Sequence, residues 1–399
     1  MALKLLILLA FCQAITALKY PCTNHKTIAL LKRPTYDFSI GILQRVAEET
    51  NDNFVFSPLS NWLQLIALSE GAKGRTLKEL WRVTRFHMRN CFKRELGKIM
   101  RNIETDLKFE TKETNVIVID KLMNVKRKFL RNIKQLYGVK AALLDFNSPE
   151  KSAIKANKMI EQATNGKISE AFYYDDFLST VLLMSDAKYF DSFWKSPFNA
   201  AYTRMEPFYS KNGLKIGEVA MMNQIGYFNI TYFPLIKADV LELPLSAGQY
   251  SMLIFLPEKN TWVKEIFYSL EATRLTSLFN VYKNEGLKLV NVKLPKFKIS
   301  TEIENLPELL VDMGIERIFS PDSAEFGGIS DYKIYASLMT QICEISVTEK
   351  GVKAHGTAEF IISGNETLMF NANRPFAYMI VERKTEFILF SGTYAVPYS

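Results

Sequence analysis

The chain has little of what enzymes and metal proteins use for chemistry. Of its 399 residues only three are histidines, His25, His87 and His355, and none stands in HExxH or another metal-binding spacing. No GxSxG, Walker or GxGxxG sequence occurs. A Ser-His-Asp triad assembled in space stays open, but His25 lies near the N-terminus and His355 in a loop-like stretch. We therefore expect a protein that is not an enzyme, with no metal and no cofactor.

Linkers and membrane-length apolar runs are also missing. No Gly-, Ser- or Pro-rich stretch, charge block or repeat divides the chain, and 48% hydrophobic residues supply a large core. The apolar run Leu5–Cys12 follows Lys4 and is too short to span a membrane. This layout predicts a signal peptide over 1–17, with cleavage near Ala17. The mature chain, 18–399, is expected to be one secreted, extracellular domain, monomeric and not bound to membranes.

Cysteine is scarce, with four in total. Removal of the signal peptide takes Cys12 and leaves three. Cys343 lies in a strand-like run and is expected to be a buried small hydrophobe. Cys22 and Cys91 are expected to be exposed, and we predict a disulfide between them, since secretion permits one. Three free or intermolecular thiols are the alternative that spacing leaves open.

Two glycosylation sequons occur, at Asn229 and Asn365. In a secreted chain each is a candidate for carrying a glycan.

The most informative stretch that the chain does contain is a loop, Glu349–Phe376, between two strand-like runs at 334–348 and 376–396. A structureless loop of this length inside a compact domain is uncommon and usually functional or disordered. Its first half alternates like a strand with one buried face. The small or β-branched positions are Val352, Ala354, Gly356 and Ala358, and the polar ones are Lys353, His355, Thr357 and Glu359. A loop with a strand pattern suggests a conformational switch.

This loop resembles the hinge and reactive-centre loop of the serpin superfamily, and other motifs follow in the family's order. They include Asn53–Ser60 (similar to the shutter motif), Gly71–Thr76, Tyr189–Phe198 (similar to the breach tryptophan motif), Met221–Gln224, Leu241–Pro244, Leu294–Phe297, Phe326–Ser330 and Arg374–Phe376. The resemblance covers nearly the whole mature chain. It implies an α+β serpin fold, a single large domain with three β-sheets, about nine helices and an exposed reactive-centre loop at about 349–373.

The resemblance also implies a function, inhibition of a serine protease by suicide trapping. The protease attacks the loop as a substrate, and the cut loop then inserts as a new strand into the large sheet. Fifteen residues of strand, 351–365, span roughly 50 Å. The implied hinge comprises Glu349, Gly351, Val352, Lys353, Ala354, His355, Gly356, Thr357 and Ala358, and counting along it places the scissile bond at Asn365–Glu366.

Several residues depart from the family's pattern. Family hinges usually continue with Thr or Ser, an acid and alanines, whereas Lys353 and His355 carry long side chains that would slow insertion. The implied breach and shutter residues are Trp194, Lys296, Ser57, Ser60, Asp186 and Gln341, where most members have Asn and His at the last two positions. The loop's alternation favours an inhibitor, and the alternative is a non-inhibitory serpin with a carrier, ligand-binding or signalling role.

A basic amphipathic helix is predicted over 88–103. Its apolar stripe comprises Met88, Phe92, Leu96, Ile99 and Ile103. Arg94, Lys98 and Arg101 fall on the opposite side, with Arg89 and Lys93 on a flank. A solvated helix face is one interpretation, and binding of a heparin-like polyanion is the sharper one. Nucleic acid is not expected as a partner, because the face lacks interleaved aromatic residues.

Overall fold

The structure is a computed structural model that describes residues 22–50, 52–87, 89–191, 193–351 and 367–397. The predicted signal peptide and most of the predicted reactive-centre loop lie outside these residues. Within them the chain forms nine α-helices. These are α2 (Asn24–Thr50), α3 (Pro58–Ser69), α4 (Gly74–Thr84), α5 (Asn90–Asp106), α6 (Arg127–Tyr137), α7 (Pro149–Ala163), α8 (Glu265–Glu271), α9 (Leu275–Glu285) and α10 (Leu306–Asp312).

Fourteen strands accompany the helices in the described residues. They are β1 (Phe54–Phe56), β2 (Thr111–Asp120), β3 (Lys140–Leu144), β4 (Leu182–Asp191), β5 (Arg204–Tyr209), β6 (Lys215–Phe233), β7 (Ala238–Pro244), β8 (Tyr250–Pro257), β9 (Lys288–Pro295), β10 (Phe297–Ile303), β11 (Leu338–Val347), β12 (Leu368–Asn371), β13 (Phe376–Glu382) and β14 (Ile388–Tyr394).

The strands form three sheets, two of which share the long strand β6. The first part of β6 pairs with β5 and β9, and its last residues, Asn229–Phe233, pair with β7. Hydrogen bonds therefore join these two sheets in one nine-stranded run, while β10-β11-β4-β2-β3 form a separate five-stranded sheet. The predicted α+β domain with three sheets and about nine helices is confirmed.

The five-stranded sheet has an uneven pattern of directions. Its central neighbours β4 and β11 run parallel, with Asp186 opposite Gln341, while β10 pairs antiparallel with β11 and β2 pairs antiparallel with β4. A segment that turned back from the end of β11 would run antiparallel to both central strands. It would find backbone donors and acceptors on each side only if β4 and β11 separated.

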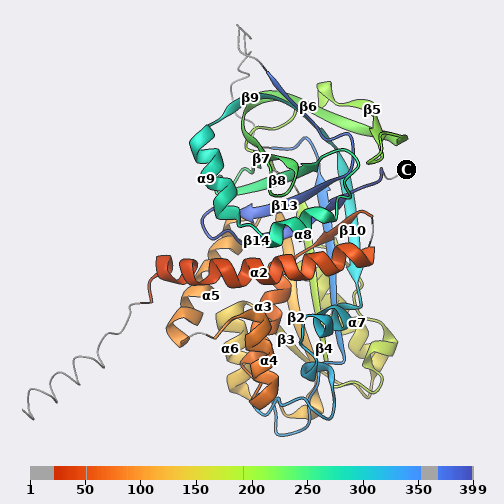
Figure 1. Cartoon of the computed structure of the whole chain (residues 1–399). Coiled ribbons are helices and arrows are strands. Elements are labelled where there is room, and N and C mark those ends of the chain that lie inside the picture. The colour runs from red at the N-terminus through yellow and green to blue at the C-terminus, as the bar shows by residue number, and fades with distance from the viewer. Residues whose placement is uncertain (1–21, 51, 88, 192, 352–366, 398–399) are drawn as a thin grey trace, which may run out of the picture.

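Helix α3 begins at Pro58, and all twelve of its residues are buried. Proline at the first helical position is favourable, because its missing N–H would have no partner within the helix. The long helix α2 crosses the middle of the molecule, between the upper strands and the helices α3 to α6 (Figure 1). A helix that is buried on every side, as α3 is, belongs to the core, and its N-cap residue Ser57 contacts Gln341 of β11.

The predicted disulfide is present, but its two cysteines are half-buried rather than exposed as expected. Cys22 and Cys91 form a disulfide with Cα atoms 5.8 Å apart, which ties the start of α2 to α5. Cys343 is a buried thiol on β11. Among the described helices none is both long and apolar enough to cross a membrane.

Candidate functional site

The start of the hinge is held by the breach tryptophan. The Trp194 ring is almost fully buried, and its Nε1–H donates to the Thr348 carbonyl at 2.6 Å. The Trp194 N–H donates to the Lys350 carbonyl at 3.0 Å, and Trp194 pairs with Gly351 in a parallel bridge. These contacts extend the β4–β11 pairing to Gly351. The rest of the predicted hinge, 352–358, lies outside the described residues, as does the predicted scissile bond Asn365–Glu366.

Replacement of Gly351 by alanine tests this contact. An added Cβ would overlap the Trp194 carbonyl oxygen and lie 2.8 Å from Pro197 Cβ. We expect Gly351→Ala to lower the free energy of unfolding by about 1 to 2 kcal/mol, the usual scale of overpacking. Chemical denaturation monitored by fluorescence measures it. Gly327→Ala is the matched control, because its Cβ would make only ordinary contacts, at 3.5 Å or more; equal effects of the two substitutions would contradict the expectation.

Glu349, the first residue of the implied hinge, forms an ion pair with the breach residue Lys296. Glu349 Oε2 lies 3.1 Å from Lys296 Nζ, and its other carboxylate oxygen accepts from the Thr203 hydroxyl at 2.9 Å. Burial alone would raise the pKa of Glu349, but backbone and side-chain hydrogen bonds, including those with Lys296 and Thr203, bring the net pKa below its ordinary value. The carboxylate thereby anchors the first residue of the implied hinge.

The shutter residues form a connected, buried network. The Gln341 side chain accepts from the Ser57 N–H at 2.6 Å and donates to the Ser57 carbonyl at 3.0 Å. The same Nε2 donates to Asp186 Oδ2 at 2.8 Å, and the Ser57 hydroxyl donates to the Leu389 carbonyl at 2.7 Å. Ser60 is buried beside them, and its carbonyl accepts from Asn115 Nδ2. Gln341 therefore ties β11 to β4 and to the start of α3.

Asp186 is a carboxyl group with no exposed surface. Its burial raises its pKa to about 6, against the opposing attraction of Lys188 two residues along β4. The Ser60 hydroxyl also favours the charged form, but the two side chains do not reach hydrogen-bonding geometry. Asp186 Oδ1 accordingly has no hydrogen-bond partner among the described residues. The raised pKa means that ionisation of Asp186 places a charge in the protein interior, which lowers the stability of the folded state.

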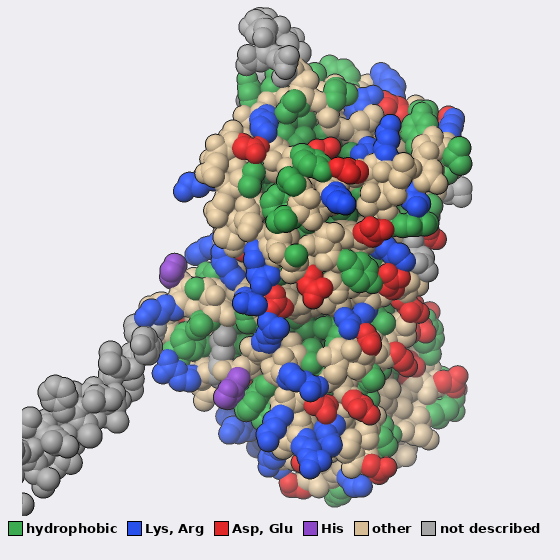
Figure 2. Space-filling model, viewed as in Figure 1, with side chains coloured by type: hydrophobic (Ala, Val, Ile, Leu, Met, Phe, Trp, Pro, Cys, Tyr) green, Lys and Arg blue, Asp and Glu red, His purple; other side chains and the backbone are tan. Residues whose placement is uncertain are grey.

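The basic helix α5 buries four residues of its predicted stripe, Phe92, Leu96, Ile99 and Ile103; the fifth, Met88, lies outside the described residues. Arg89, Arg94, Lys98 and Arg101 are exposed. Lys93 differs from this group, because its Nζ lies 2.6 Å from Glu70 Oε1 and its side chain is only 19% exposed. Lys98 pairs with Glu95 at 2.6 Å, and Arg101 donates to the Gln135 carbonyl at 3.1 Å. Lys and Arg side chains gather on this side of the molecule, around α2, α4 and α5 (Figure 2).

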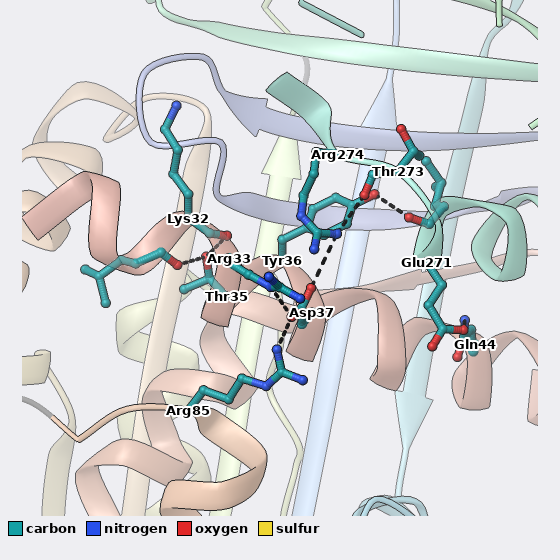
Figure 3. A network of polar contacts seen from close by, with 12 residues as sticks. Lys32, Arg33, Thr35, Tyr36, Asp37, Gln44, Arg85, Glu271, Thr273 and Arg274 are labelled. Atoms are coloured by element: carbon teal, nitrogen blue, oxygen red, sulfur yellow. Dashed lines mark hydrogen bonds and ion pairs between the residues drawn. The ribbon is translucent and has the colours of Figure 1, made fainter. Parts of the chain in front are cut away.

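A second basic cluster was not found from the sequence. Three guanidinium groups converge on the Asp37 carboxylate of α2 (Figure 3). Arg33 Nε lies 3.3 Å from Asp37 Oδ2, and Arg85 Nη1 contacts the same oxygen. Arg274 Nη1 lies 3.6 Å from the other oxygen, Asp37 Oδ1. One negative charge meets three positive ones, so the cluster keeps an excess of two. The i,i+4 spacing of Arg33 and Asp37 was the available sequence signal; Arg85 and Arg274 join them only in space.

Of the two predicted glycosylation sites, one lies within the described residues and the other does not. Asn229 is half-buried at the end of the β6–β9 pairing, and its Nδ2 donates to Glu242 Oε2 at 2.7 Å. A glycan on this nitrogen would leave it one N–H and would need space beside Glu242. The other sequon, at Asn365, lies outside the described residues. No group of three or more metal-binding side chains is found in the described part of the chain.

Comparison with known proteins agrees with this geometry. The family model described as "Serpin (serine protease inhibitor)" matches residues 34–397. An uncharacterised serpin-like protein of Thermococcus kodakarensis is 33% identical, over 86% of this chain and 80% of its own. Human serpin B4 is 28% identical, over 90% of this chain and 97% of its own. The crystal structure of native protease nexin-1 with heparin matches with a TM-score of 0.83 and 25% sequence identity, and the match covers 93% of this chain and 100% of that one. The chain belongs to the serpin family.

Proposed function

We propose that the protein is a secreted inhibitor of a serine protease that traps its target by loop insertion. The observation that carries the proposal is the geometry where β11 ends. Strand β11 ends at Val347, and the chain continues to Gly351, which pairs with Trp194 just past the end of β4. A cut segment starting at 352 would therefore begin next to the β4–β11 seam. The small positions Val352, Ala354, Gly356 and Ala358 then fall on one face of the inserted strand.

Secretion is part of the same proposal. It rests on the signal-peptide pattern over 1–17 and is supported by the Cys22–Cys91 disulfide, because disulfides persist in oxidising compartments and are rare in the cytosol. N-terminal sequencing of the protein from culture medium tests it. A start near Leu18 is expected, whereas retention of the whole product inside the producing cells would contradict it.

The experiment on inhibition is incubation with a panel of serine proteases, followed by denaturing electrophoresis. We expect a covalent complex that survives denaturation. Two hinge variants sharpen the test. Ala354→Glu places a charge at a position that must be buried on insertion, so the loop should be cut without complex formation. Lys353→Glu changes an outward position and should preserve the complex. Cleavage without complex in the parent protein would instead support the non-inhibitory alternative, in which Lys353 and His355 slow insertion.

Polyanion binding is a second candidate function, carried by the exposed side chains of Arg94, Lys98 and Arg101. The arginines around Asp37 extend the basic surface toward α2 and α9. One structural relative, protease nexin-1, was solved with heparin. A polyanion of this kind is attracted by summed charge rather than by one ion pair, and salt screens the attraction.

Elution from a heparin column tests this candidate. We expect the parent protein to elute well above physiological salt, and the triple variant Arg94→Glu, Lys98→Glu, Arg101→Glu to elute at or below it, because six units of charge are lost from one face. The control is the same charge change in Lys151→Glu, Lys155→Glu, Lys158→Glu, exposed residues with the same spacing on α7. Equal losses in both variants would mean that net charge alone is measured.

A further inference from the structure

Three turns of the chain carry large apolar side chains that face solvent. They are the β5–β6 turn (210–214), the β6–β7 turn (234–237) and the segment between β8 and α8 (258–264), and the strands that they join lie together in the upper part of the view (Figure 1). Leu214 is 70% exposed, Leu235 63% and Trp262 56%. Turns are usually built from small and polar residues, so three apolar tips in this region require an explanation.

Hydrogen bonds join the three turns to one another. The Asn260 N–H donates to the Lys211 carbonyl at 3.0 Å, and the Glu258 N–H donates to the Lys237 carbonyl at 3.0 Å. The hydroxyl of Tyr232, at the end of β6, donates to Glu258 Oε1 at 2.5 Å. The turns therefore form one connected surface, here called the turn surface. Exposed apolar residues that gather on one surface, unlike scattered ones, commonly mark an interaction site.

The turn surface is also basic. Each turn has a lysine within three residues of its apolar tip, and these are Lys211, Lys237 and Lys259. The other charged residues of the three turns are Lys264, which pairs with Glu48 of α2, and Glu258. Three lysines against one glutamate leave an excess of two positive charges. The charge complements an anionic partner.

Trp262 and Lys211 indicate what kind of anionic partner fits. Lys211 Nζ lies 3.6 Å from the centroid of the Trp262 ring, so an ammonium group and an exposed indole are presented together. Lysine is depleted in protein–protein interfaces. At a membrane surface, by contrast, tryptophan lies at the level of the lipid headgroups, and lysine buries its methylene stem while its charge stays in water. A lysine beside each apolar tip therefore favours lipid over protein.

We propose that the turn surface binds the surface of an anionic lipid bilayer. The three apolar tips enter the boundary between headgroups and acyl chains, and the three lysines lie at the level of the lipid phosphates. The sequence predicted a chain not bound to membranes because it has no long apolar run. That reasoning does not cover this surface, since its apolar residues come from three separate turns. The proposal does not depend on protease inhibition or on polyanion binding.

Tryptophan fluorescence of the full chain mixed with vesicles tests the proposal. Trp62 and Trp194 are buried and Trp81 is half-buried, so Trp262 is the most exposed indole. We expect a saturable blue shift with vesicles of equal parts phosphatidylserine and phosphatidylcholine, and about tenfold weaker binding to phosphatidylcholine alone. Trp262→Phe should still sediment with the vesicles but lose the shift. No blue shift with the parent protein would overturn the proposal.

Leucine variants place the contact. Leu214→Ser with Leu235→Ser should raise the lipid concentration needed for half-binding about tenfold or more, because two large apolar side chains no longer leave water. The matched control is Leu122→Ser with Leu287→Ser, exposed leucines outside the three turns, which should change half-binding less than about twofold. Equal effects of the two pairs would show that the turns are not the contact and would overturn the assignment.

The basic helix α5 needs its own control, because it can attract anionic vesicles by charge alone. Arg94→Glu with Lys98→Glu and Arg101→Glu should keep the blue shift. Vesicle sedimentation that is lost in this variant but survives the Leu214/Leu235 change would assign the contact to α5 and overturn the proposal. Free glycerophosphoserine should not displace the protein from vesicles; full displacement would mean that a headgroup alone is recognised and would also overturn it.

Discussion

Cleavage of the chain within 352–366 is expected to raise the melting temperature of the protein by about 12 °C. The reason is the arrangement of β4 and β11, which now pair with one another in parallel over nine residue pairs. An inserted strand would exchange this single ladder for two antiparallel ladders of similar length. The gain is roughly ten backbone hydrogen bonds, each contributing about 1 kcal/mol net, together with burial of the small side chains on one face.

The expected size of the shift follows from the unfolding entropy. For 399 residues, about 2.1 cal/mol/K per residue gives an entropy near 0.8 kcal/mol/K. A stabilisation of about 10 kcal/mol divided by this entropy corresponds to roughly 12 °C. Unfolding of a chain of this size can be irreversible, so intact and cleaved samples must be compared at one scan rate.

Differential scanning calorimetry before and after limited proteolysis measures the shift, with mass spectrometry to locate the cut. Cleaved Ala354→Glu is the control, since its hinge charge should prevent insertion and leave the melting temperature within 2 °C of the intact variant. An unchanged melting temperature in the cleaved parent protein would remove the basis for loop insertion. A rise without any protease complex would mean that insertion occurs but is too slow to trap.

The sequence carries a local pattern for the hinge, which stays a prediction because residues 352–358 lie outside those that the structure describes. Alternation from Val352 to Ala358 is local and can be read without a structure. The shutter positions Asp186 and Gln341 came from resemblance, but their contact depends on the register of β4 against β11, which no local pattern encodes. The stripe of α5 was predicted correctly because helical period is local. The inward turn of Lys93 was not predicted, because it depends on Glu70 at the end of α3.

The cluster around Asp37, and a cavity that lies between α5, α6 and β2, show the same limit. Arg85 and Arg274 are almost two hundred residues apart in sequence and meet at Asp37 only when α4 and α9 pack beside α2. The cavity joins residues from α3, α5, α6, β2 and β4. A space is defined by what packing leaves unfilled, so single residues carry no signal for it.

Replacement of Asp186 by asparagine is expected to stabilise the protein at neutral pH by about 3 kcal/mol. Burial raises the pKa of Asp186 from 3.8 to about 6, so the folded protein holds this proton more tightly than the unfolded chain. The stabilising contribution of the protonated group is complete below about pH 4 and is lost as the pH rises through 6. A difference of about two pKa units corresponds to about 3 kcal/mol. Asparagine keeps an oxygen that can accept from Gln341 but carries no charge to bury.

The pH dependence distinguishes this cause from a change in packing. The difference in free energy of unfolding between Asp186→Asn and the parent protein should be near zero at pH 4, grow between pH 4 and 6, and level off by pH 7. Denaturant titrations at a series of pH values measure it, and Asp175→Asn, at an exposed position, should show no such trend. A constant difference at all pH values would mean that Asp186 is already neutral at pH 7 or equally charged in both states. If the trend is found, the shutter carries a buried charge that weakens the β4–β11 seam at neutral pH, and separation of these strands becomes less costly, as loop insertion would require.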